Sequence, residues 1–337
     1  MKPRIGIIPG DPSGIGPELI AKLLSDESVT DQADILLIGD AHLFEMGQRQ
    51  ADSSFSLTPC DARTSDWTEL PGFAHHAQDT IDADDVNIAA VTIASGKSAL
   101  ANLNTALELA RDGIIDAITF GPFNKAALKE AGLGHEDELH YIAEFLGVEN
   151  YVSELNTLDG IWTSRVSSHI SLKEVPDYIT KERINEAVYL IDRTLKRSGM
   201  ARPRLSVAAL NPHAGDNGNF GTEEIDIIAP AVQALQVQQV NVDGPWPSDT
   251  VFLKAKAKEV DGIITMYHDQ GQIALKIMGF DRGVTVHGGI PFPVTTPAHG
   301  TAFDITGTGT ADVTATREAF NIACNMVANW EKSDSAA

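Results

Sequence analysis

The sequence predicts an α/β protein in which a largely parallel sheet carries helices on both faces, a three-layer α/β/α arrangement. Short apolar runs alternate with amphipathic helical segments along almost the whole chain, which is typical of βα units. Three of the runs are closed by a histidine. The 337 residues, 43% hydrophobic and 21% charged, are enough for a two-lobed globular protein with a large core.

The first half of the chain follows the predicted alternation. A glycine-rich turn joins the first strand to a helix that starts near Gly16-Pro17, where proline suits the first helical turn. A polar, irregular stretch is expected from about Ala51 to Asn87. The other predicted elements are the strands Ile5–Ile8, Ile35–Ile38 and Ile114–Phe120 and the helix Ser95–Ala110.

In the second half, helix signals are clearer than strand signals. Thr180 is expected to cap a helix whose apolar residues recur at helical spacing until Gly199. Thr222 is expected to cap another, with Glu223 and Glu224 in its positive first turn. Thr314–Trp330 is predicted as the last helix.

The histidines that close three strand-like runs are His169, His213 and His268. Ligands of open α/β proteins bind outside the carboxyl ends of the strands, so the three imidazoles could converge there on one metal such as zinc. A single histidine at such a place more often caps a strand or bonds a carbonyl. The repeated placement favours a metal-dependent enzyme.

Two further segments carry candidate chemistry. Asp249 lies in a proline-bounded loop, where it could serve as ligand, base or support for a ligand, or act only as a helix N-cap. If the residues after His268 form a helix, Lys276 lies two turns beyond that histidine. Residues 299–309 form a Gly/Thr-rich loop of the sort that approaches a nucleotide closely.

Composition narrows the partners. A net charge of -22 and a pI near 4.7 argue against a nucleic-acid partner, because phosphate neutralisation needs clustered Lys and Arg. The two cysteines offer no metal-thiolate spacing. The N-terminal residues do not resemble a signal peptide and no run of about 18 apolar residues occurs, so we expect a cytoplasmic protein without a membrane partner.

Taken together, the motifs resemble the 4-hydroxythreonine-4-phosphate dehydrogenases of pyridoxal phosphate synthesis, and the resemblance runs almost from end to end. It rests on GDPSGIGPE at 10–18, GPFNKAAL at 121–128, SSHISLKEVP at 167–176, LNPHAGDNGNFG at 210–221, GPWPSDTVF at 244–252, MYHDQGQIALKIMGF at 266–280 and HGTAFDITGTGTAD at 299–312.

The resemblance implies a two-domain, isocitrate/isopropylmalate-dehydrogenase-like fold. We expect an NAD-side domain of residues 1–130 with 300–337, and a metal, substrate and dimerisation domain of residues 131–299. The resemblance also implies that His169, His213 and His268 bind a divalent metal, with zinc expected before magnesium, cobalt or manganese. It assigns substrate contact to Lys276 and places the late loop near NAD, through His299, Gly300, Thr301, Asp304 and Gly307.

The sequence departs from this family where substrate is bound. The family's GHTE loop, whose His-Thr pair contacts substrate, is replaced by LGHEDEL at 133–139, so that His135 takes the family histidine's place or Glu136 and Asp137 occupy the pair's places. A substrate-binding Asn and Arg correspond to Thr285 and Val294. Losing an arginine while gaining carboxylates predicts a substrate other than 4-hydroxythreonine 4-phosphate.

These observations predict a homodimeric, metal- and NAD-dependent dehydrogenase, with an active site shared across the dimer, that oxidises a secondary alcohol of a small hydroxy acid, with or without decarboxylation. Lys276 and Asp249 are the expected residues for substrate orientation and proton handling. Alternative substrates are a sugar-acid phosphate or a carboxylated cis-dihydrodiol. Alternatives of another class are a zinc hydrolase and an NAD-sensing binding protein.

Overall fold

The computed structural model describes residues 2–334 and divides into two compact units. Unit 1 comprises the chain up to Glu149, with Val284–Val286 and Ile290–Ala328. Unit 2 comprises Asn150–Gly283, His287–Gly289 and the chain from Asn329. The roles expected for residues 1–130 with 300–337 and for 131–299 stay a prediction, and the two units are described separately below.

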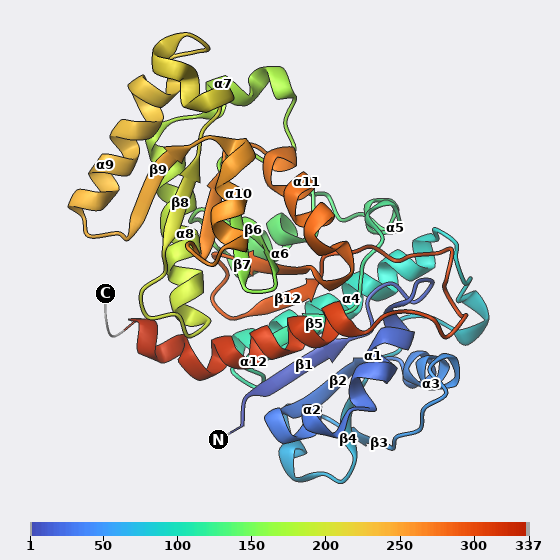
Figure 1. Cartoon of the computed structure of the whole chain (residues 1–337). Helices are drawn as coiled ribbons and strands as arrows, with labels where there is room; N and C mark the ends of the chain where they lie inside the picture. The colour runs from blue at the N-terminus through green and yellow to red at the C-terminus, as the bar shows by residue number, and fades with distance from the viewer. Residues whose placement is uncertain (1, 335–337) are drawn as a thin grey trace. The chain divides into compact units, whose positions relative to one another are not determined.

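Unit 1 contains a sheet in the order β3-β4-β2-β1-β5-β12-β11 (Figure 1). Its strands are parallel except for β11, which pairs antiparallel with β12 through Val284–Val286. The predicted irregular stretch from Ala51 to Asn87 is wrong in part, because it contains two strands. The strands are β1 (Arg4–Ile8), β2 (Asp34–Gly39), β3 (Leu57–Cys60), β4 (Phe73–Ala77), β5 (Ala117–Phe120), β11 (Val284–Gly288) and β12 (Val294–Pro297).

Helices cover both faces of the unit 1 sheet. On one face Ile5 and Leu37 pack with Leu23, Phe44 and Phe320, which come from three different helices. The helix α4 packs against β1, β2 and β5 and has Thr92 as its N-cap, in line with the predicted Ser95–Ala110 helix. The helices are α1 (Gly16–Leu24), α2 (Glu27–Gln32), α3 (Ala41–Gln50), α4 (Ile93–Arg111), α5 (Lys125–Glu130), α6 (Glu138–Leu146) and α12 (Thr314–Asp334).

Unit 2 contains strands in the order β6-β7-β10-β8-β9 (Figure 1). The strands β7, β10, β8 and β9 are parallel, and β6 forms an antiparallel hairpin with β7. The carboxyl ends of the parallel strands therefore meet at one edge, as the sequence predicts. The strands are β6 (Ser153–Leu158), β7 (Ile161–Arg165), β8 (Leu205–Ala208), β9 (Val242–Trp246) and β10 (Gly262–Thr265).

The helices of unit 2 also lie on both faces of its strands. Val251 and Phe252 of α10, with Ala274 of α11, pack around Ile263 of β10. On the other face, α8 lies so close that a side chain on Gly262 would meet Ile191. The predicted cap is confirmed, since Thr180 accepts the amide hydrogen of Arg183. The helices are α7 (Val175–Tyr178), α8 (Lys181–Arg197), α9 (Ala229–Val237), α10 (Ser248–Lys256) and α11 (His268–Gly279).

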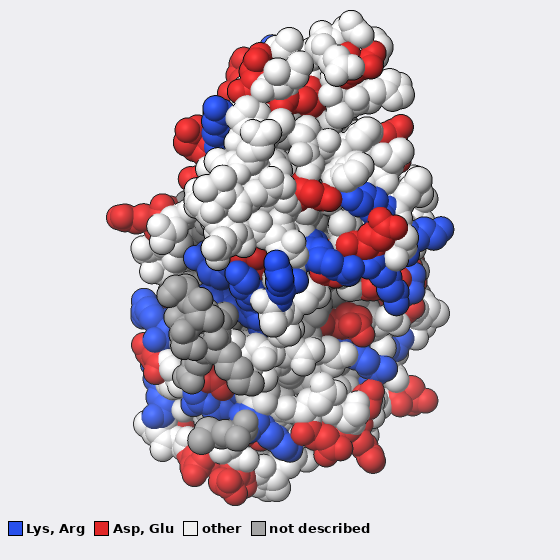
Figure 2. All heavy atoms as spheres, turned by 60° about the vertical axis from the view of Figure 1, so that its left-hand side comes forward, with Lys and Arg blue, Asp and Glu red and all other residues white. Residues whose placement is uncertain are grey.

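Charge is distributed unevenly over the surface. Figure 2 shows one face on which basic and acidic side chains are interspersed, so the net charge of -22 does not make this face uniformly negative. Across residues 2–334, no helix is long and apolar enough to span a membrane.

Candidate functional site

The three candidate metal ligands lie beyond their strands, and the expectation that each histidine closes a strand is wrong. β7 ends at Arg165, β8 at Ala208 and β10 at Thr265. Between β7 and His169 the chain stays tied to the neighbouring segment, because Val166 donates to Thr265 O and Ser167 to Met266 O. Each histidine therefore sits on a short extension at the carboxyl end of its strand.

His169 and His268 lie side by side, with ring centres 5.4 Å apart and ring planes tilted by 47°. Two imidazoles on one tetrahedral zinc, with Zn–N bonds of about 2.0–2.1 Å, have ring centres roughly 5 Å apart. Nδ1 of His268 lies 2.7 Å from a carboxylate oxygen of Asp269, an arrangement that fixes the tautomer and leaves Nε2 for a metal. This pair fits a divalent cation.

His213 is placed differently: it is exposed and lies on the segment Pro212–Gly218. Its ring centre lies 6.3 Å from that of Phe220. In this conformation the three imidazoles do not form a cluster with ligand atoms all within 4.8 Å, among the residues that the structure describes. The structure therefore brings two of the predicted ligands together and leaves the third on its own loop.

The loop that carries His213 is built from left-handed backbone. Residues 213–217 all have positive φ, between 43° and 79°, although only Gly215 lacks a side chain. Residues other than glycine rarely adopt this region, and each one costs free energy there. A run of this kind persists only when its surroundings hold it.

Glu224 provides much of that support, a role that sequence reasoning missed. Its buried carboxylate accepts the amide hydrogens of Leu210 and Asn211, at 2.8 and 2.7 Å, and a bond from the Asn211 side chain. The prediction that Glu224 lies in the first turn of a helix is confirmed, but the predicted cap is wrong, because the helical segment Glu224–Ile228 is π-helical and has Glu223, not Thr222, at its N-cap position. In the run TEEID, a glutamate is expected to lie near the positive end of a helix, so the sequence carried no signal that Glu224 supports the neighbouring loop.

Gln270 is a second support residue that the sequence did not reveal. Its side-chain oxygen accepts the amide hydrogen of Met266, and its nitrogen donates to Ala209 O, both at 2.8 Å. It therefore ties the segment after β8 to the segment after β10, so that the chain is fixed just before two of the candidate ligands.

Lys276 and Asp249 are both exposed in unit 2. Lys276 lies on α11 two turns beyond His268, as predicted. Asp249 lies in the first turn of α10, where Pro247 occupies the N-cap position, so the simpler interpretation of Asp249 as an N-cap is wrong. The exposure of these two side chains does not by itself assign them a role, so the catalytic roles of both residues stay predictions.

In unit 1, the divergent segment 133–139 is fixed by α6. Asp137 is the N-cap of α6 and accepts the amide hydrogen of His140, whose ring also lies 2.6 Å from the carboxylate. Burial opposes ionisation of Asp137, but these contacts outweigh it and hold its pKa below the usual value. Nε2 of His135 lies 2.7 Å from the carboxylate of Glu144. Asp137 therefore has a structural task, while the substrate role of His135 stays a prediction.

Thr285 and Val294, which stand where the resembling family has Asn and Arg, lie on the paired strands β11 and β12. Both are buried, and Val294 is fully inaccessible. Val294 is thus a core residue of unit 1 and offers no donor to a phosphate. The substrate contact expected of Thr285 stays a prediction.

The glycine-rich turn after β1 and the loop after β12 are packed together in unit 1. The amide of Ile15 donates to Thr301 O at 3.1 Å, and Asn124 donates to the Thr301 hydroxyl at 3.4 Å. A Cβ atom on Gly14 would lie 2.7 Å from Cβ of Thr301, so only glycine allows this approach. The two motifs form one surface.

A buried ion pair holds the far end of the same loop. Glu18 is fully buried on α1 and pairs with Lys22 at 2.8 Å. The Lys22 ammonium also donates to Gly309 O and Ala311 O, and Glu18 accepts the amide hydrogen of Ala311. Gly300, Asp304 and Gly307 of this loop are exposed, and their contact with a cofactor stays a prediction.

Asp11, in the same glycine-rich turn, is an unusual carboxylate that sequence reasoning did not single out. It is 1% exposed; Oδ1 accepts the amide hydrogen of Ser13, while Oδ2 has no hydrogen-bond partner among the residues described. Burial raises the pKa of Asp11 to about 6, against the opposing effect of the Ser13 amide. Asp11 thus titrates close to neutral pH.

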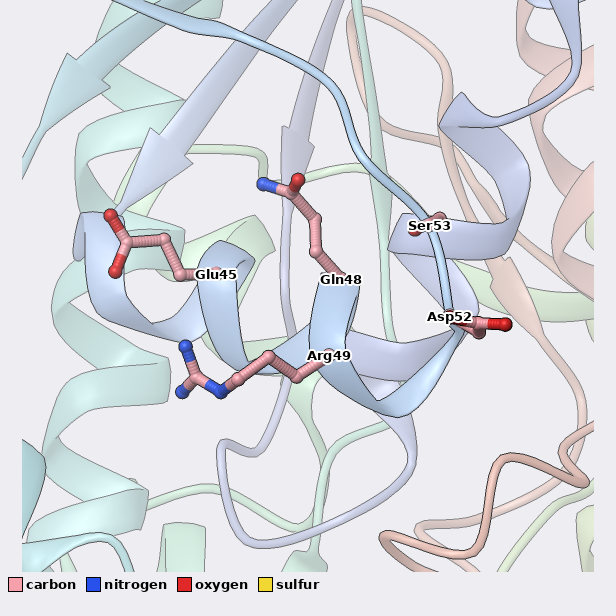
Figure 3. Close-up of a pocket in the computed structure, with 5 residues that line it drawn as sticks. All are labelled: Glu45, Gln48, Arg49, Asp52 and Ser53. Carbon is pink, nitrogen blue, oxygen red and sulfur yellow. The ribbon is translucent and has the colours of Figure 1, made fainter.

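A separate hollow of about 450 Å³ lies on α3 (Figure 3). Its lining side chains do not point to a common centre, because the Asp52 carboxylate is directed away from those of Glu45 and Arg49. We therefore assign no ligand to this hollow. It is lined by Glu45, Gln48, Arg49, Asp52 and Ser53.

Histidines that lie just beyond the carboxyl ends of parallel strands in one unit, and a glycine-rich loop fixed over the first helix in the other, are features of an α/β dehydrogenase. The model of the family described as pyridoxal phosphate biosynthetic protein PdxA matches residues 31–323. The chain belongs to this family, which confirms the resemblance and the fold class.

Among curated relatives, a Pseudomonas aeruginosa protein named 4-hydroxythreonine-4-phosphate dehydrogenase 2 is 52% identical over 96% of this chain and 97% of its own. A Symbiobacterium thermophilum protein named D-threonate 4-phosphate dehydrogenase is 35% identical over 98% of this chain and 99% of its own. The chain is thus a dehydrogenase acting on a CH–OH group, and such an enzyme implies a nicotinamide cofactor and a divalent metal.

Solved structures of dehydrogenases are also similar to this chain. The Klebsiella pneumoniae 4-hydroxythreonine-4-phosphate dehydrogenase covers 97% of this chain and 98% of its own, with a TM-score of 0.83 and 33% identity. The similarity to the Burkholderia xenovorans terephthalate 1,2-cis-dihydrodiol dehydrogenase covers 96% of this chain and 98% of that enzyme's chain, with a TM-score of 0.67 and 25% sequence identity.

Proposed function

We propose that this chain is an NAD- and metal-dependent dehydrogenase that oxidises a secondary alcohol of a small, phosphorylated hydroxy acid. The observation that carries the proposal is the pairing of His169 with His268 at the carboxyl ends of neighbouring parallel strands. His213 is the proposed third ligand, since its loop follows β8, which lies beside β10. Closing the site requires this loop to bring its imidazole toward the other two.

A cation held there supplies Lewis-acid polarisation of the substrate hydroxyl. A nicotinamide cofactor held by residues 299–309 would accept the hydride of the carbinol carbon, and Asp249 and Lys276 are the candidates for the base that takes the hydroxyl proton. Where the product is a β-keto acid, loss of CO₂ follows. Three imidazoles with an open position favour zinc, although magnesium, cobalt and manganese remain alternatives.

NAD is the proposed cofactor, bound over residues 299–309. The exposed Asp304 and Gly307, with His299, Gly300 and Thr301, form the proposed contact surface. A 2′-phosphate needs a cation, and no Lys or Arg lies between His299 and Asp312. Lys22, whose ammonium donates to Gly309 O of this loop, is already paired with Glu18.

The proposed substrate class is a sugar-acid phosphate, as in the name of the Symbiobacterium relative, and we expect 4-hydroxythreonine 4-phosphate not to be the best substrate. Val294, at the family's arginine position, is buried, so the arginine contact that the resemblance implies for 4-hydroxythreonine 4-phosphate is lacking here. A carboxylated cis-dihydrodiol is a second candidate, favoured by the similarity to the terephthalate dihydrodiol dehydrogenase.

We also propose a homodimer with a shared active site. Ile273 and Ile277 are 59% and 81% exposed and lie four residues apart on α11, so they form one apolar stripe beside Lys276. Burying them against a second copy would cover this stripe and bring the partner close to Lys276. A cytoplasmic location, and the absence of nucleic-acid and membrane partners, stay predictions.

The decisive experiment is a screen of phosphorylated and unphosphorylated hydroxy acids for NADH formation, with the protein supplied in turn with each divalent metal. Metal-dependent NADH formation supports the proposal. Metal-dependent hydrolysis without NADH would favour the zinc hydrolase, and NAD binding without turnover of any compound would favour the NAD-sensing protein.

A further inference from the structure

One buried carboxylate collects the hydrogen bonds at the base of the loop that carries His213. Glu224 is 3% exposed, and its Oε1 atom accepts the amide hydrogens of both Leu210 and Asn211, at 2.8 and 2.7 Å. Its Oε2 atom accepts from Nδ2 of Asn211 at 3.0 Å. The backbone is therefore fixed directly before Pro212, the residue that precedes the histidine.

The same carboxylate also lies against the middle of the loop. A Cβ atom on Gly215 would lie 2.8 Å from Glu224 Oε2 and 3.0 Å from Gly221 O, so a side chain at this position would push the carboxylate aside. The carbonyl oxygen of Gly215 accepts the amide hydrogen of Phe220 at 3.1 Å. Glu224 thus contacts both the base of the loop and its left-handed turn, and joins them into one piece.

Few torsions separate this fixed base from the imidazole. The ring of Pro212 fixes its own φ, and the amide of Asn211 is held by Glu224. A metal ligand on a rigid support loses little conformational entropy when it binds, whereas one loop residue released from its fixed conformation costs about tenfold in affinity. Glu224 can therefore affect the affinity for a cation without contacting it.

Neighbouring carboxylates hold the loop less well. Glu223 accepts only from the side chain of Asn211, at 2.6 Å, and is more exposed than Glu224. Asp226 is exposed, although it belongs to the same π-helical turn as Glu224. The hydrogen bonds to the backbone amides before the loop are made by Glu224, so removal of this one carboxylate should have an effect that removal of Asp226 does not.

We propose that Glu224 is a positioning residue for His213: its carboxylate holds the loop so that the imidazole is presented to a divalent cation, and it thereby sets the affinity of the site for that cation. The inference rests on the proposed function, which assigns His213 as a metal ligand. Glu224 does not bind the cation itself, because it is buried and both of its oxygens accept hydrogen bonds from the chain.

The zinc affinity of the purified, metal-free protein tests this proposal without substrate or NAD. The dissociation constant is measured by competition with a chromogenic chelator, and circular dichroism confirms the folding of each variant. Glu224→Ala removes the carboxylate, and Glu224→Gln keeps a carbonyl oxygen that can accept both amide hydrogens. Asp226→Asn is the matched control. Glu224→Asp, which withdraws the carboxylate by one carbon, replaces Glu224→Ala if that variant does not fold.

We expect Glu224→Ala or Glu224→Asp to raise the dissociation constant for zinc about tenfold or more, as the loss of a group that orients a metal ligand does. Glu224→Gln should restore it to within about threefold of the unmodified protein, because the two amide contacts are kept. Asp226→Asn should leave it unchanged. A folded Glu224→Ala or Glu224→Asp protein that binds zinc as tightly as the unmodified protein would overturn the proposal.

The same substitution in a His213→Ala background shows whether the effect passes through the histidine. There, Glu224→Ala should weaken zinc binding no further, because the ligand that Glu224 positions is gone. A general loss of structure would instead weaken binding equally in both backgrounds. Equal weakening would therefore remove the positioning role.

NADH formation separates this inference from the proposed function. Zinc-dependent NADH formation by a protein whose zinc affinity does not respond to Glu224→Ala would keep the proposed function and overturn the inference. Zinc binding that depends on Glu224 only when His213 is present, without NADH from any hydroxy acid, would support the inference and overturn the proposed function. Equal zinc affinity of His213→Ala and the unmodified protein would remove His213 from the site, and the inference with it.

Discussion

The amide of Ile15 donates a hydrogen bond to the carbonyl oxygen of Thr301, 3.1 Å away, and so joins the first βα turn to a loop near the other end of the chain. Ile15 and Leu19 also pack with Ala311, with Ala302 and Ile305 beside them. The candidate cofactor loop is therefore held by the first helix at both of its ends, and its middle is left free to contact a ligand.

From this arrangement we expect NAD to bind at least about tenfold more tightly than NADP. The 2′-phosphate of NADP would find no free cation on residues 299–312, and Lys22 is paired with Glu18. Fluorescence titration with each dinucleotide gives the two dissociation constants. Equal or tighter binding of NADP would show that a basic residue from elsewhere reaches the loop.

Substitution of one proposed metal ligand should abolish tight metal binding. Purified protein is expected to contain about one divalent metal per subunit, and His213→Ala should lose most of it, because a site with three protein ligands cannot spare one. Elemental analysis after dialysis makes the measurement, with His76→Ala as the matched control in unit 1. Metal content of His213→Ala equal to that of the unmodified protein removes His213 from the site.

Lys276→Ala should lower kcat/KM by about 10-fold to 10²-fold while folding and metal content are retained. A cation positioned against a substrate anion stabilises the transition state by a few kcal/mol at most sites of this kind, and less where solvent reaches it. Lys256, an exposed lysine on α10, serves as the control when replaced by alanine. Steady-state kinetics that do not distinguish the two variants would assign Lys276 to the solvated surface.

Asp11→Asn should stabilise the fold above pH 6 and have little effect below pH 4. Burial raises the pKa of Asp11 from 3.8 to about 6, so the folded protein holds a proton that the unfolded chain has released between these values. Stability is therefore lost as pH rises from about 4 to 6, and the loss persists at higher pH, with a limit of about 3 kcal/mol.

Urea unfolding of Asp11→Asn at pH 4, 6 and 8 tests this sign, and Asp31→Asn on the exposed surface is the control. The asparagine oxygen can still accept the Ser13 amide hydrogen, so the comparison isolates the charge. A variant that is less stable than the unmodified protein at pH 8 would mean that the Asp11 carboxylate is needed in its ionised form.

The elements of the fold could be predicted where one physical signal dominates. Helical spacing with a threonine cap identified α8, and the alternation of apolar runs with helices identified the parallel sheet. The end of β7 could not be placed from the sequence, because Val166 and Ser167 lie beyond the strand yet still donate backbone hydrogen bonds to Thr265 O and Met266 O. The polar strands β3 and β4 were also not predicted, because their sequences do not alternate buried apolar residues with exposed polar ones.

The candidate site was predictable only at the level of residue types. Histidines after buried strands indicated a metal, and the structure places His169 beside His268. The residues that hold these ligands, such as Glu224 and Gln270, act through contacts between segments far apart in sequence. No local spacing encodes such contacts, so they emerged only from the three-dimensional arrangement.

The left-handed run from His213 to Asn217 has a consequence for how this part of the chain opens. Its strained backbone favours local unfolding, while Glu224 holds the amides of Leu210 and Asn211 directly before it. Amide hydrogens at 210 and 211 should therefore exchange slowly next to a loop that exchanges quickly. Without the Glu224 carboxylate, residues 210 and 211 and the loop 213–217 would exchange as one fast segment. The loop that carries His213 would then become free to move.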